Sequence, residues 1–78
     1  MWILPMATGE LSIAAVHRLI ERAGAERVGD DAAEELRRIL EDLAERVGKK
    51  AREFAAHAGR KTVKADDIRL AIREVIRE

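Results

Sequence analysis

The stretch that decides the fold is DAAEELRRILEDLAERVGKKAREFAAHA, residues 31–58. Apolar side chains recur in it at steps of three and four residues, which is the period of one face of an α-helix. These side chains are Leu36, Leu40, Leu43, Val47, Ala51, Phe54 and Ala58. Asp30 and Asp31 are predicted to supply the N-cap and negative charge in the first turn. The pattern predicts one helix from Asp31 to Ala58, about 42 Å long.

A shorter amphipathic helix is predicted on each side of the long one. The first runs from Ile13 to Ala23 behind the N-cap residue Ser12, and Gly24 ends it. The last runs from Ala65 or Asp66 to Arg77 and follows Gly59, a residue type that commonly ends the preceding helix. Each short helix reaches at most about 18 Å, so the two cannot cover both ends of the long helix.

Composition and length favour a small all-α domain that needs a second chain. Charged residues make up 38% of the 78 positions and apolar residues 47%, with one Phe and one Trp, so the interior must be aliphatic. A chain of this length is near the lower limit for a self-sufficient core. We therefore expect an obligate dimer in which two long helices cross. Its core is expected to contain Leu36, Leu40, Leu43 and Val47.

The domain is expected to span residues 10–78, behind an N-terminal extension of residues 1–9. The first six residues are apolar, but they are too short for a signal peptide and are interrupted by Pro5. They could be an upstream extension, the result of a misassigned start before Met6, or a flap that docks on the dimer. A flexible or weakly docked extension is favoured. The sequence has no cysteine, which suits a reducing cytoplasm, and no apolar run of membrane-spanning length.

The connection before the last helix, GRKTVKADDI at residues 59–68, concentrates basic side chains on one tight turn. Arg60, Lys61 and Lys64 lie there beside the hydroxyl of Thr62, a combination that favours phosphate contact. The net charge of the whole chain is zero. Its two parts differ, because residues 10–45 carry 10 acids and 5 bases (−5) while residues 46–78 carry 10 bases and 5 acids (+5).

The connection after the first helix, residues 24–29, carries a second basic side chain at a loop. Arg27 lies there beside Val28, the only large apolar residue of the loop. Val63 is likewise a single β-branched residue in the second connection. We expect Val28 and Val63 to form a small parallel bridge between two chains.

No constellation of residues indicates catalysis. His17 and His57 lack the spacing of a metal site, and the chain has no cysteine and no glycine-rich phosphate loop. The acidic pair Asp66 and Asp67 is explained by first-turn helix charge. The sequence therefore predicts a protein that is not an enzyme and needs neither a metal nor another cofactor.

Two motifs at the loops resemble those of archaeal histones. AGAERV at residues 23–28 and HAGRKTVKADDI at residues 57–68 carry the resemblance, which extends from Leu11 to about Val75. It implies a histone fold of short, long and short helices that pairs head to tail into a handshake dimer. It also implies a cytoplasmic, nucleoid-associated protein that binds and bends duplex DNA with little sequence preference, as a homodimer or with a histone paralogue.

The resemblance implies a role for individual residues. Arg27 would enter the minor groove, oriented by Thr62 of the partner chain. Phosphates would be contacted by Lys61, Lys64, Arg18 and the backbone amides of residues 12–14, which include Ser12 and Ile13. Arg60 and Asp67 would form an ion pair that fixes the second loop. Judged without the resemblance, Arg18, Arg22 and Lys61 are more simply solvated surface, and Thr62 could cap locally.

The resemblance also implies that dimers join through a four-helix bundle into tetramers and longer stacks on DNA. The matching positions are Phe54, His57 and Asp67, with His57 expected to donate a hydrogen bond to Asp67 of the neighbouring dimer. The alternative is that His57 only interacts with the last carbonyl groups of its own helix.

Three residues depart from the family pattern and open a second functional interpretation. Glu21 and Glu53 stand where basic residues are more typical, and Ser12 replaces a helix start bounded by proline. Fewer neutralised phosphates mean weaker binding that salt readily abolishes. The alternative function is a histone-fold module for protein–protein assembly, either a heterodimer partner or a subunit that caps a filament, with weak DNA binding.

Overall fold

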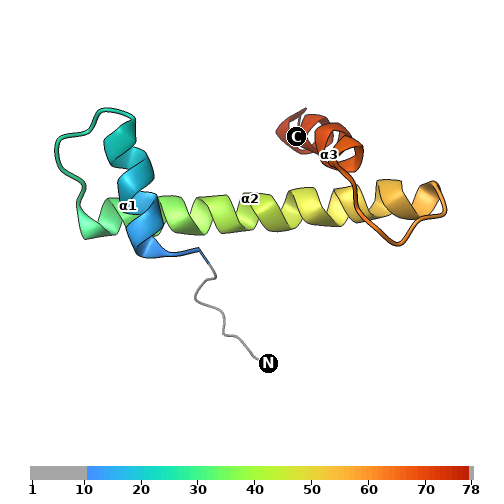
Figure 1. The fold of residues 1–78 in the computed structure, drawn as a ribbon, viewed down its shortest axis with the longest axis horizontal. Coiled ribbons are helices and arrows are strands. Elements are labelled where there is room, and N and C mark those ends of the chain that lie inside the picture. The colour runs from blue at the N-terminus through green and yellow to red at the C-terminus, as the bar shows by residue number, and fades with distance from the viewer. Residues whose placement is uncertain (1–10, 78) are drawn as a thin grey trace, which may run out of the picture. The chain divides into compact units, whose positions relative to one another are not determined.

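The computed structural model describes residues 11–77, and this part of the chain consists of three α-helices without a β-strand (Figure 1). The helices are α1 (Ile13–Arg22), α2 (Asp30–His57) and α3 (Ala65–Arg77). The predicted all-α class and the order short, long, short are confirmed. Helix α1 ends one residue earlier than predicted, and α2 is displaced by one residue at each end. The expected N-terminal extension lies outside the described residues.

The helix starts explain these boundaries. The Ser12 hydroxyl accepts a hydrogen bond from the Ala15 amide at 3.2 Å, as an N-cap does. At α2 the Gly29 carbonyl accepts from the Ala32 and Ala33 amides, both at 3.1 Å, so Gly29 occupies the N-cap position. The prediction that Asp30 is the N-cap was wrong. It is the first helical residue and contributes negative charge there.

Glycines end the first two helices in the left-handed backbone conformation. Gly24 has φ 116° after α1, and Gly59 has φ 76° after α2. The Gly59 amide donates to the Ala56 carbonyl and the Arg60 amide donates to the Ala55 carbonyl, each at 2.9 Å. These bonds satisfy carbonyl groups that the end of α2 would otherwise leave free and turn the chain sharply into the second connection.

The chain divides into two compact units, which are described separately. In the first, up to Asp42, α1 lies against the first part of α2 (Figure 1). Val16 of α1 and Ala33 of α2 are completely or almost completely buried. In the second, from Leu43 onward, α3 packs on the last part of α2. Its buried core consists of Val47, Ala51, Ala71 and Val75, with Leu43, Phe54 and Ile72 packed against it.

The apolar stripe of α2 is covered by its own chain to a greater extent than predicted. Val47 and Ala51 are 6% and 0% exposed because α3 packs over them. Ala58 lies beyond α2 and is exposed. Leu36, Leu40, Leu43 and Phe54 are only half-buried. Large apolar side chains that stay exposed are Leu11, Leu19, Ile39, Val63, Ile68, Leu70 and Ile76.

Candidate functional site

The second connection, residues 58–64, is held by an ion pair between Arg60 and Asp67. The guanidinium donates to both carboxylate oxygens, Nη1 to Oδ2 at 2.9 Å and Nη2 to Oδ1 at 3.0 Å. Nη1 also donates to the Thr62 carbonyl at 2.8 Å. Oδ2 of Asp67 accepts from the Lys64 amide at 2.8 Å, which caps the start of α3. One buried carboxylate thus fixes the turn and the helix that follows it.

The electrostatics of this turn keep Asp67 ionised. The side chain is only 3% exposed. The hydrogen bonds from the Arg60 guanidinium and then from the Lys64 amide lower the pKa of Asp67 to about 2. The hydrogen bond with Asp67 likewise raises the pKa of Arg60. The charges of Arg60 and Asp67 therefore balance each other, and neither contributes a free charge to the surface.

The other polar side chains of the connection face solvent. Lys61, Thr62 and Lys64 are exposed, and neither lysine forms an ion pair within residues 11–77. The Thr62 hydroxyl makes no hydrogen bond in that range either, so the local cap considered from the sequence does not form there. The connection therefore presents two unbalanced positive charges and a free hydroxyl on a fixed backbone.

The first connection carries Arg27, which is exposed, and Val28, which is half-buried. The loop is fixed at its start by the Ala25 amide, which donates to the Ile20 carbonyl at 3.4 Å. Across the loop, Nε2 of His17 lies 3.3 Å from Oδ1 of Asp30. Arg27 is thus carried on a short loop whose two ends are tied together.

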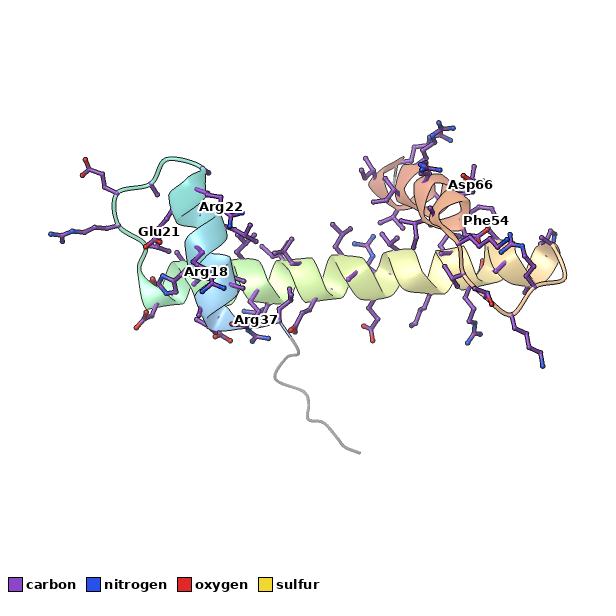
Figure 2. The ribbon with its side chains drawn as sticks, in the orientation of Figure 1. Arg18, Glu21, Arg22, Arg37, Phe54 and Asp66 are labelled. Carbon is purple, nitrogen blue, oxygen red and sulfur yellow. The ribbon has the colours of Figure 1, made fainter. Side chains whose placement is uncertain are left out.

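Helix α1 presents its basic residues to solvent. Arg18, Glu21 and Arg22 are all exposed, and Arg22 projects from the end of the helix (Figure 2). At the other end, the backbone amides of residues 12–14 start the helix behind Ser12. The charges of Arg18 and Arg22 have no ion-pair partner within residues 11–77. This helix therefore offers positive charge, but Glu21 lies between its two arginines.

A buried ionic cluster under the start of α1 was not predicted from the sequence. Arg37 is 6% exposed and donates from Nη1 to Oε1 of Glu41 at 2.8 Å and from Nη2 to Oε2 of Glu34. Oε2 of Glu41 accepts from the Leu11 amide at 2.8 Å. The signal was present, because acids three residues before and four residues after an arginine lie on its side of a helix.

The residues expected at the dimer–dimer contact are only partly brought together. Phe54 and His57 line a shallow pocket of the second unit with Lys50, Glu53 and Glu74. Phe54 is half-buried against the core, and His57 is exposed. Asp67 does not line this pocket and is engaged by its own chain. Figure 2 shows Phe54 where α3 lies on α2.

Two features of residues 11–77 bear on other classes of function. No three His, Asp or Glu side chains there come together as metal ligands. No helix in that part of the chain is long and apolar enough to cross a membrane.

Comparison with known proteins gives the same family twice. Residues 9–72 match the family described as histone-like transcription factor (CBF/NF-Y) and archaeal histone. The chain is 64% identical over 64 residues to the archaeal histone HAN1 of Thermococcus zilligii, and the match covers 82% of this chain and 96% of that protein. It is 39% identical to probable archaeal histone 3 of Methanocaldococcus jannaschii, with the same two shares covered.

Proposed function

Since the chain belongs to the family of histone-like transcription factors and archaeal histones, which are DNA-binding chromatin proteins, we propose that it pairs into a handshake dimer that bends duplex DNA without sequence preference. Family membership agrees with the resemblance in the loop motifs. Dimers would stack along DNA and compact the chromosome in the nucleoid of the cytoplasm. The rest of the proposal assigns roles to particular residues.

The fixed second connection is the observation that carries the proposal. Lys61 and Lys64 are exposed on a turn that Arg60 and Asp67 hold in place, so little side-chain or backbone order remains to be gained when phosphates bind. Phosphate contacts of this kind position a protein on DNA but carry no sequence information. Sequence-independent binding is what such a surface supports.

We assign the minor-groove contact to Arg27, with the free hydroxyl of Thr62 from the partner chain beside it. A narrow minor groove attracts a guanidinium through its negative potential, without a hydrogen-bond code for individual bases. In the dimer, Val28 of one chain and Val63 of the other would pair as the short bridge expected from the sequence. That bridge would bring the first loop of one chain beside the second loop of its partner.

Helix α1 would supply the remaining phosphate contacts. Arg18 is exposed, and the amides of residues 12–14, from Ser12 through Ile13, lie at the positive end of the helix dipole. Glu21 lies on the same exposed side of the short helix and weakens its attraction for DNA. We therefore expect binding that is readily reduced by salt.

The dimer would cover the apolar surface that a single chain leaves open. Leu36, Leu40 and Leu43 are half-buried, and Ile39 is 53% exposed on the same helix. Val47 would contribute less to the dimer core than the sequence suggested, because α3 already buries it. The partner is either a second copy or a histone paralogue.

Stacking of dimers would use Phe54 and His57. Asp67 can serve as the expected acceptor, because its Oδ1 accepts only one hydrogen bond from its own chain while Oδ2 accepts two. The imidazole of His57 from a neighbouring dimer would donate to Oδ1. Since Asp67 is almost completely buried, that contact requires the neighbouring helix to approach closely.

The alternative is a protein–protein assembly module with weak DNA binding. The zero net charge and the acidic excess of residues 10–45 favour it. A gel-shift titration at low salt with several unrelated duplexes separates the two functions. The proposal expects all of them to shift at similar concentrations and Arg27→Ala to weaken all of them alike. Absence of a shift would leave the assembly module.

A further inference from the structure

The strongest unexplained feature is the charge buried under the start of α1. Arg37 and Asp67 are the two charged residues that the described part of the chain buries. Asp67 fixes the second connection, but Arg37 has no role in the DNA contacts proposed above. Burying a guanidinium on the helix face toward α1 costs desolvation unless hydrogen bonds replace water. Glu34 and Glu41 supply those bonds.

Glu41 links this cluster to the backbone of the segment that enters α1. Its Oε1 accepts from Arg37, while its Oε2 accepts from the Leu11 amide, both at 2.8 Å. Leu11 immediately precedes the N-cap Ser12. Arg37 therefore orients the Glu41 carboxylate so that its second oxygen holds the chain where α1 begins, as Figure 2 lets the reader follow around Arg37.

Helix α1 depends on such an anchor. It has ten residues, and isolated helices of that length are marginal in water. Its other contacts with α2 include the buried Val16 and the ion pair between His17 and Asp30. Asp30 is fully exposed, so that pair is weak. The carboxylate of Glu41 thus holds the end of α1 that lies opposite the first loop.

We propose that Arg37 and Glu41 are positioning residues for DNA binding, because they fix the start of α1 and thereby the direction in which Arg18 meets a phosphate. This inference rests on the proposed function. Neither residue touches DNA itself. Their effect would appear as a loss of the Arg18 contact in variants that leave the Arg18 side chain intact.

The substitution Glu41→Gln tests this inference through the sign of its effect. The glutamine carbonyl can still accept from Arg37, but its NH₂ group then faces the Leu11 amide, and two donors cannot bond. Removing one acid per chain should by itself tighten binding to a polyanion. The matched control Glu35→Gln makes the same charge change on α2, at an exposed pair with Arg38. We expect the control to bind as tightly as wild type or tighter, and Glu41→Gln to bind roughly three- to tenfold more weakly.

Combination with Arg18→Ala distinguishes positioning from general damage. If Glu41 acts through Arg18, Arg18→Ala should cost little more in the Glu41→Gln background, and both single variants should flatten the salt dependence of binding equally. Hydrogen exchange should also accelerate at the Ala15 and Val16 amides, which bond to Ser12. Arg37→Met should act like Glu41→Gln, with Arg38→Met as its control.

Several results would overturn the inference. One is Glu41→Gln binding as tightly as Glu35→Gln. Another is full additivity with Arg18→Ala, which would indicate a loss of general stability. Circular dichroism melting of each variant shows whether it is folded under the assay conditions, and Glu41→Gln remains informative if Arg37→Met does not fold. A wild-type chain that shifts no duplex DNA would refute the proposed function itself, and that result is visible without any variant.

Discussion

Lys61→Ala should weaken DNA binding by an amount that depends on salt in a predictable way. The side chain is exposed on the turn fixed by Arg60 and Asp67, and it has no ion-pair partner within residues 11–77. Each handshake dimer would carry two copies, so the variant loses about two phosphate contacts. The slope of log affinity against log salt should then become shallower by about 1.8. Between about 50 and 200 mM salt, this change makes the defect about twelvefold larger at the lower concentration.

Fluorescence anisotropy with a labelled duplex, titrated at four or more salt concentrations, measures this slope. Arg69→Ala is the matched control, because it removes the same charge from a residue whose guanidinium is already paired with Asp66. We expect the control to change the slope much less than Lys61→Ala does. Equal changes in the two variants would mean that only net charge matters, and an unchanged slope in Lys61→Ala would mean that Lys61 contacts no phosphate.

Three further predictions concern stability and assembly. The thermal midpoint should rise with protein concentration, because Leu36, Leu40 and Leu43 are only half-buried in one chain; a constant midpoint with a monomeric mass in ultracentrifugation would refute the dimer. The stabilising effect of ionised Asp67 should be fully present above its ordinary pKa of 3.8 and be lost as pH falls through about 2, so the melting difference between wild type and Asp67→Asn should shrink over that range and not at neutral pH. His57→Ala should shorten nuclease-protected DNA to the length covered by one dimer while the dimer stays folded, and unchanged lengths would reject the proposed stacking contact.

The long-range order of the helices could be predicted because local signals agree with one another. The period of the apolar residues in α2, Ser12 at a helix start and the glycines at 24 and 59 all point to the observed elements. The start of α2 was harder to place, because Gly29 and Asp30 are both acceptable N-cap residues and only the hydrogen bonds distinguish them.

The extent of burial could not be predicted from the same pattern. Helical period identifies a face, but it does not say which residues of that face the chain itself covers. Val47 and Ala51 are covered by α3, whereas Leu36 and Leu40 remain half-buried. Arg37 was missed for a related reason. A basic residue in an acidic stretch is usually solvated, and only tertiary packing of α1 turns this one into a buried ionic cluster.

Local pairing explains how a chain of zero net charge can still attract DNA. In the second unit Asp66 is bound to Arg69, Asp67 to Arg60, and Glu53 to Lys50. Carboxylates paired at short range act on a distant phosphate mainly as dipoles, whose field falls faster with distance than that of a single charge. Lys61 and Lys64 have no such partner within the described residues. The phosphate backbone would therefore meet a locally positive turn, and the number of unpaired lysines, not the net charge, would set the salt dependence of binding.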